Sequence, residues 1–190
     1  MSKEGKREQI LTALNNLLPG KRFHEITLDE VARAAQVGKG TIYLYFHDKD
    51  ALFYELICYR IGCLRQELMS LNNCTIEELP GKVMAMVEKF IREHHTGFGA
   101  VSDLAAHVAR LTPEQHEQLK NEGGLLVDAL AGVMRNAESS WSEAEARSYA
   151  QILLWMIDGY SRSRSSFGGV NGVPDTEFLT TFFRRGAKLG

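Results

Sequence analysis

Cysteine and proline are scarce in this sequence, whose 190 residues include three cysteines and four prolines. The cysteines (Cys58, Cys63 and Cys74) are odd in number and form no C-x-x-C pair. We therefore expect no disulfide framework, and a reducing cytoplasm fits this composition. The few prolines and the few segments of strand-like alternation favour an all-α protein.

Long apolar runs are also missing. No segment approaches the ~18 consecutive apolar residues of a membrane helix, so we expect no membrane association. The first nine residues hold no apolar stretch, and we expect no signal peptide. No G-x-S-x-G, P-loop or dinucleotide fingerprint occurs. The sequence therefore predicts no catalytic residue and no cofactor.

Net charge is close to balance, at -2 with a pI near 6.3. This argues against a protein that coats nucleic acid without regard to sequence. Residues 1–60 carry nine Lys and Arg against eight Asp and Glu, whereas the remainder carries thirteen against sixteen. The mild positive bias is compatible with a small nucleic-acid contact in the first third of the chain.

Apolar periodicity and capping signals predict helices along the whole chain. Two signals are especially clear. Thr27 followed by Glu30 is a capping box, and Ile26 with Val31 forms a hydrophobic staple around the same helix start. Thr112-Pro113 marks another start. The expected helices span residues 3–18, 28–35, 39–46, 49–71, 76–95, 101–111, 113–136, 143–167 and 176–190.

The two short helices at 28–35 and 39–46, joined by a three-residue turn, have the layout of a helix-turn-helix unit. Ile42 and Phe46 are four residues apart and should pack inward on Val31 and Ala35. The second helix then turns its remaining large side chains outward: Lys39, Thr41, Tyr43, Leu44 and Tyr45. Such a face suits contact with DNA phosphates and thymine methyl groups. The alternative is a packed bundle in which both tyrosines are partly buried.

Residues 7–56 resemble the TetR family, most specifically in TLDEVA at 27–32 and VGKGTIYLYFHDKDAL at 37–52. The resemblance implies an all-α fold, with a three-helix helix-turn-helix domain at 1–50 and a larger helical domain for effector binding and dimerisation at 51–190. It implies phosphate contacts by Thr27, Lys39, Thr41, Tyr43 and Lys49, and base-facing positions for Leu44 and Tyr45. Gly40 would allow a close approach of the phosphate backbone, and Gly38 belongs to the same contact set.

Two positions depart from the family pattern. Gln36 stands where the family usually has Gly, so a left-handed backbone there would cost ~1 kcal/mol. Gly38 stands where the family often has Ser. Glycine can still cap the second helix, but one side-chain phosphate contact is lost.

The resemblance does not extend to the larger domain, so the predictions for that domain rest on its own residues. Apolar bands at 125–134 and 149–160 are expected to serve both core and dimer interface, as in a four-helix bundle shared by two subunits. The middle helices carry several Met, aromatic and His residues, among them Met84. Side chains of these types can line an adaptable pocket or form ordinary core. The predicted effector-binding residues are Met86, Phe90, His94, Phe98, His107 and Trp155. Few charges cluster there, so an uncharged or weakly polar effector is expected.

Adjacent histidines at 94 and 95 point in different directions on a helix, and no ligand pair lies four residues apart, so we expect no metal site. The leading hypothesis is a homodimeric regulator that binds a double-stranded DNA operator and is released by a small apolar effector. A second hypothesis is a DNA-binding protein of the same fold without an effector. A third is a helical enzyme or structural module that only looks like a helix-turn-helix.

Overall fold

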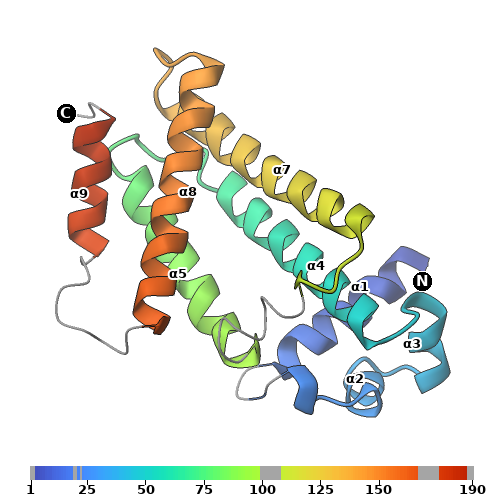
Figure 1. The fold of residues 1–190 in the computed structure, drawn as a ribbon. Coiled ribbons are helices and arrows are strands. Elements are labelled where there is room, and N and C mark those ends of the chain that lie inside the picture. The colour runs from blue at the N-terminus through green and yellow to red at the C-terminus, as the bar shows by residue number, and fades with distance from the viewer. Residues whose placement is uncertain (1–2, 19–20, 22, 99–107, 167–175, 188–190) are drawn as a thin grey trace. The chain divides into compact units, whose positions relative to one another are not determined.

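The computed structural model describes residues 3–18, 21, 23–98, 108–166 and 176–187, which form helices joined by turns and loops and contain no strand (Figure 1). The all-α prediction is confirmed. The elements, in chain order, are α1 (Lys3–Leu17), η1 (Phe23–Glu25), α2 (Leu28–Ala34), α3 (Lys39–Tyr45), α4 (Lys49–Met69), α5 (Leu79–Phe98), α7 (Pro113–Ala137), α8 (Glu143–Ser166) and α9 (Thr176–Gly186).

Most helix boundaries lie within a few residues of their predicted positions. The chief difference is α5, which starts three residues later than predicted and continues through Gly97 to Phe98. A single glycine costs only about 1 kcal/mol in a helix, so it did not end this one. The predicted helix at 101–111 falls mostly outside the described residues.

Tertiary contacts divide the chain into two compact units. Unit 1 comprises Met1–Arg60 and Arg92–Leu119, and unit 2 comprises Ile61–Ile91 and Lys120–Gly190. The first unit therefore extends ten residues beyond the predicted boundary at residue 50, because Leu52, Phe53 and Leu56 of α4 are buried among side chains of α1 to α3. The functional division into 1–50 and 51–190 stays a prediction.

The core of unit 1 holds the helix-turn-helix together. Ile42 and Phe46 are buried in one cluster with Val31 and Ala35, as the sequence predicts. Helix α1 supplies the other side of this core through the buried side chains of Ile10, Leu11, Leu14 and Leu18. These contacts determine which face of α3 points into the core, and therefore which face points to solvent.

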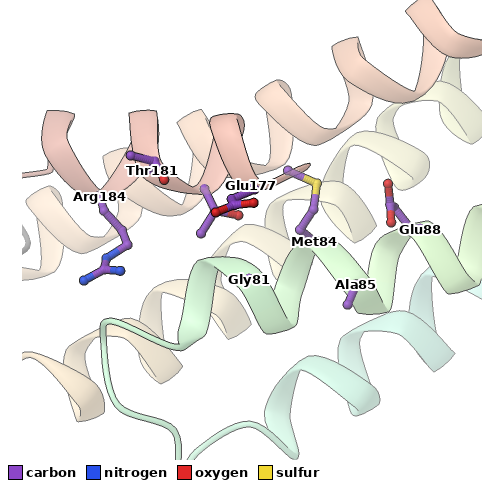
Figure 2. A pocket seen from close by; sticks show the side chains of 8 residues that line it. Gly81, Met84, Ala85, Glu88, Glu177, Thr181 and Arg184 are labelled. Carbon is purple, nitrogen blue, oxygen red and sulfur yellow. The ribbon is translucent and has the colours of Figure 1, made fainter. Parts of the chain in front are cut away.

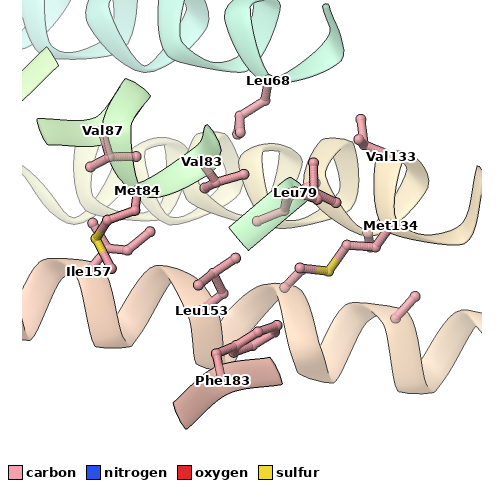
Figure 3. Close-up of a cluster of buried hydrophobic side chains, with 14 of the residues drawn as sticks. Leu68, Leu79, Val83, Met84, Val87, Val133, Met134, Leu153, Ile157 and Phe183 are labelled. Carbon is pink, nitrogen blue, oxygen red and sulfur yellow. The ribbon is translucent and has the colours of Figure 1, made fainter. Parts of the chain in front are cut away.

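Unit 2 is built around α7 and α8, with α5, α9 and the end of α4 packed against them (Figure 3). Leu130, Ala131, Val133 and Met134 of α7 are buried in its core. The inner face of the apolar band at 125–134 thus packs inside the subunit, whereas Leu125 is exposed, and the share of this band in a dimer interface stays a prediction. On α8, Leu153, Ile157 and Tyr160 are buried, whereas Ile152 and Trp155 are exposed.

Two general properties of the described residues bear on function. None of their helices is both long enough and apolar enough to cross a lipid bilayer. No group of three or more His, Cys, Asp or Glu side chains among them is arranged to hold a metal ion.

Candidate nucleic-acid interface

The start of α2 is fixed by the capping box that the sequence predicts. The Glu30 backbone N–H donates to Thr27 Oγ1 at 3.2 Å, and the Thr27 N–H donates to Glu30 Oε2 at 2.8 Å. A hydrogen bond from Lys21, followed by those from Thr27, lowers the pKa of Glu30 to about 2. The carboxylate that holds this helix end is therefore ionised well below neutral pH.

The turn between α2 and α3 contains a strained residue. Gln36 has φ of 53°, in the left-handed region that side chains other than glycine rarely adopt. The Val37 N–H donates to the Ala32 carbonyl at 2.9 Å, and the Gln9 amide of α1 donates to the Ala35 carbonyl at 2.7 Å. These bonds hold the turn in place, and the predicted left-handed backbone at Gln36 is confirmed.

Helix α3 presents a mixed face to solvent. Leu44 is 78% exposed and Tyr43 is 51% exposed, although both are large and apolar for a solvated surface. Thr41 is half-buried. Tyr45 is also half-buried and packs against the unit 1 core, with its ring centroid 6.4 Å from that of Phe46. Tyr45 is therefore less outward than the sequence reading expected, because its ring reaches back over the core.

Two exposed glycines leave the backbone at the start of α3 accessible. Gly38 is the N-cap and supplies no side-chain cap, so the Thr41 N–H donates to the Gly38 carbonyl at 2.8 Å. Gly40 is exposed, and a Cβ added there would meet nothing within 4 Å. Both glycines leave room for another backbone to approach the helix start, where the peptide dipoles favour an anion.

Two lysines frame this surface, and each already has a partner. Lys39 Nζ lies 2.8 Å from Asp29 Oδ2 on α2, and this hydrogen bond raises the pKa of Lys39. Lys49, the first residue of α4, is half-buried and donates to the His24 carbonyl at 3.0 Å. Burial lowers the pKa of Lys49. Asp29 was overlooked as part of this surface, although its place in the first turn of α2 was visible in the sequence.

The predicted DNA contacts thus fall on neighbouring parts of unit 1: the start of α2, the whole of α3 and the start of α4. The surface they form combines exposed glycine backbone, hydroxyl groups, an apolar side chain and ammonium groups. These are the groups that contact phosphates and base edges in a major groove. The individual contacts stay predictions.

The predicted effector residues are not gathered into one cavity by the described residues. Met86 is half-buried against the unit 2 core, and Trp155 is 66% exposed on α8. The side chains of Phe90, His94 and Phe98, and all of His107, lie outside the described residues. A hollow of about 320 Å³ lies instead between α5 and α9, as Figure 2 shows. Its lining includes Glu88, Glu177 and Arg184, so this hollow is not the uncharged pocket that the sequence suggested.

Comparison with known proteins agrees with this geometry. Residues 10–56 match the family described as "Bacterial regulatory proteins, tetR family". The chain is 27% identical over 163 residues to the HTH-type transcriptional regulator YdgC of Bacillus subtilis, covering 83% of this chain and 80% of that protein. It is 26% identical over 166 residues to the HTH-type transcriptional repressor BepR of Brucella suis, covering 81% and 78%.

The fold is similar to that of solved regulators. The crystal structure of FadR from Bacillus subtilis in complex with stearoyl-CoA matches with a TM-score of 0.60 at 17% identity, covering 96% of each chain. The match spans both compact units, whereas the family profile covers only the helix-turn-helix and its neighbours. Residues 10–56 thus form the DNA-binding helix-turn-helix region of the TetR family, and the chain is similar along about four fifths of its length to transcriptional regulators.

Proposed function

We propose that this regulator is a repressor that binds a two-fold DNA operator as a homodimer and leaves it when a small molecule binds. The observation that carries the DNA-binding part is the division of α3 into two faces. Ile42 and Phe46 are buried, whereas Tyr43 and Leu44 are turned to solvent. A folded helix gains little from exposing those side chains to water, but a major groove offers them partners.

The proposed contacts fall into two classes. Thr27, Lys39, Thr41, Tyr43 and Lys49 hold phosphates, and Gly38 and Gly40 allow the DNA backbone to approach. Leu44 contacts base edges, where its side chain fits a thymine methyl group. Tyr45 lies beside it and contributes its ring edge. Phosphate contacts set position and affinity, whereas Leu44 and Tyr45 set sequence preference.

Dimerisation is proposed through α8 and α9, because each carries large apolar side chains that are exposed in the subunit. On α8, Ile152, Trp155 and Gly159 recur at helical spacing on one solvent-facing side. On α9, Phe178 and Phe182 are exposed and stack with ring centroids 6.4 Å apart. One short recognition helix reads too few bases to select a site, and a two-fold dimer would place two of them about 35 Å apart, one turn of DNA.

Effector release is proposed for the region 51–190. BepR is named a repressor, and the FadR structure contains stearoyl-CoA, which supports a ligand-controlled repressor of this fold. Helix α4 runs from unit 1 into unit 2 and gives a covalent route by which a ligand could shift the two recognition helices. A ligand that prefers the released state ~100-fold, or ~2.7 kcal/mol, would cut operator affinity substantially, and the operator would weaken ligand binding by the same factor.

The test starts with selection of an operator from genomic fragments, followed by mobility-shift titrations of variants. Tyr43→Phe removes one hydroxyl and should weaken binding to every sequence by ~1 kcal/mol. Leu44→Ala should instead change the preferred base at one position of each half-site. Met69→Ala removes a similarly exposed apolar side chain from unit 2 and should change neither.

Failure to select any DNA would contradict the DNA-binding proposal. An operator that binds tightly but responds to no small molecule would favour the alternative, a DNA-binding protein of this fold without an effector.

A further inference from the structure

Helix α1 carries two basic side chains just before the residues that match the family. The family match covers residues 10–56, whereas Lys6 and Arg7 precede it. Arg7 forms an ion pair with Glu55 of α4. Lys6 is half-buried, and its ammonium donates to the side-chain amide oxygen of Gln9 at 3.4 Å. Because an amide is neutral, this contact does not offset the positive charge of Lys6.

Gln9 places Lys6 next to the turn of the helix-turn-helix. Its amide nitrogen donates to the Ala35 carbonyl at 2.7 Å, while its amide oxygen accepts from Lys6. Ala35 is the C-cap of α2 and precedes Gln36, whose left-handed backbone redirects the chain towards α3. The Lys6 ammonium is therefore joined through two hydrogen bonds to the turn that leads into α3.

Contacts between α1 and α4 give the direction of α1 within unit 1. Three side-chain contacts join the two helices in the same order along both: Arg7 with Glu55, Thr12 with Tyr59, and Asn15 with Arg60. Residue numbers rise together on the two helices, so α1 and α4 run in the same direction. The N-terminal end of α1 therefore lies at the same end of unit 1 as Lys49, the first residue of α4 and a proposed phosphate contact.

The acidic side chains closest to Lys6 in sequence lie on another face of α1. Glu4 and Glu8 are exposed, and each is two residues away from Lys6. At 100° per residue, both point ~160° away from it. An anion that approaches Lys6 from the side of the turn therefore does not meet these two carboxylates first.

We propose that Lys6 binds a phosphate of the DNA backbone, so that the interface extends from the helix-turn-helix to the first turns of α1. Gln9 is the positioning residue that holds Lys6 beside the turn. Contacts of α1 with this turn and with α4 independently support the placement. An ammonium on a flexible stem suits a phosphate, and phosphate contacts set position and affinity without reading bases. The inference deepens the DNA-binding part of the proposed function, on which it rests.

The test measures how the affinity of the full chain for the selected operator depends on salt. Lys6→Ala should weaken binding about fivefold at about 0.1 M salt and reduce the slope of log affinity against log salt by about 0.9. Lys6→Arg keeps the charge and should retain most of the affinity and the slope. Preference among operator sequences should stay the same in both variants, because a phosphate carries no base identity.

Operators with single methylphosphonates, each of which neutralises one phosphate, locate the contact. At the phosphate bound by Lys6, this substitution should weaken binding of the wild type, and Lys6→Ala should lose this sensitivity at that position alone. A purely structural effect of residue 6 would leave every position as sensitive as before. Gln9→Ala keeps the charge of Lys6 but removes its link to the turn, so it should weaken binding and change the salt slope less than Lys6→Ala does.

Lys89→Ala is the matched control, because it removes an exposed lysine of α5 in unit 2 and should change neither affinity nor slope. An unchanged salt slope in Lys6→Ala, an equal change in Lys89→Ala, or the absence of any phosphate whose effect depends on Lys6 would overturn this proposal. Tyr43→Phe in the same assays separates this outcome from failure of the proposed function. If Tyr43→Phe weakens binding and Lys6→Ala does not, α3 contacts DNA and α1 does not.

Discussion

Lys39 of α3 and Asp29 of α2 form an ion pair across the helix-turn-helix, with Nζ 2.8 Å from Oδ2. Both side chains are about half exposed, so the pair adds little to stability. The ion pair instead affects how Lys39 binds DNA. A DNA phosphate that takes the Lys39 ammonium must compete with Asp29, whose own negative charge repels the phosphate.

Asp29→Asn should therefore increase affinity for DNA of any sequence several-fold at low salt, because the competing carboxylate is gone. Lys39→Ala should weaken binding and reduce the slope of log affinity against log salt by about 0.9 for one lost phosphate contact. Fluorescence anisotropy at several salt concentrations measures both. Unchanged affinity in the Asp29→Asn variant would mean that Lys39 does not contact a phosphate.

Gln36 pays a conformational penalty for its φ of 53°. Gln36→Gly should raise the free energy of unfolding by about 1 kcal/mol, since glycine adopts this conformation without strain. Gln36→Ala is the matched control and should give little change, because alanine has the same Cβ conflict. Urea denaturation of the three proteins measures the effect. Equal stabilisation by both substitutions would show that strain at residue 36 is not the cause.

The left-handed backbone at Gln36 was implied by the family resemblance, because the family usually has Gly at this position. The capping box at Thr27 and the inward pair Ile42 and Phe46 could be predicted from spacing along one or two helices. Asp48 caps α4 through a similarly local contact, in which the Ala51 N–H donates to its Oδ1 at 2.7 Å. Each of these features rests on residues less than ten positions apart or on a single periodic face.

Features that depend on which helices meet were harder to foresee. Val133 and Trp155 both belong to apolar bands, and no local signal shows that the first is core and the second is exposed. The charged hollow requires α5 and α9 to lie side by side, although Glu88 and Glu177 are far apart in sequence. Periodicity identifies an apolar face, but the partner of that face is a tertiary property.

Glu30 makes the stability of unit 1 depend on pH. Its pKa in the folded chain is about 2, below the usual 4.5. The ionised carboxylate therefore stabilises the fold fully above pH 4.5, and this contribution is lost as the pH falls from 4.5 towards 2. Glu30→Gln should destabilise the protein at pH 6, and the difference from wild type should vanish near pH 2.

Urea denaturation at pH 6, 4.5, 3.5 and 2.5 measures this difference. Glu143→Gln, which removes an exposed carboxylate of α8, serves as the control and should show no comparable pH-dependent difference. A Glu30→Gln difference that stays constant over this range would place the role of residue 30 in packing rather than in charge.

The dimer proposal makes a sharp distinction between α7 and α8. Gly159 and Trp155 lie on the exposed side of α8, and a Cβ at Gly159 would meet nothing within 4 Å in the subunit. Gly159→Glu should therefore leave the subunit folded while placing a charge in the proposed interface. Leu125 is an exposed apolar residue of α7, and Leu125→Glu introduces the same charge on that helix.

We expect the wild type to sediment as a dimer at micromolar concentration. Gly159→Glu should raise the dimer dissociation constant at least tenfold, because a carboxylate buried in an apolar interface loses its hydration without gaining a partner. The Gly159→Glu variant should keep the helical circular dichroism and the thermal melting of a folded subunit. Affinity for the complete operator should fall as the dimer dissociates, whereas weak binding of the single subunit to one half-site should persist. If Leu125→Glu dissociates the dimer and Gly159→Glu does not, the interface lies on α7, and the exposed aromatic side chains of α8 and α9 need another explanation.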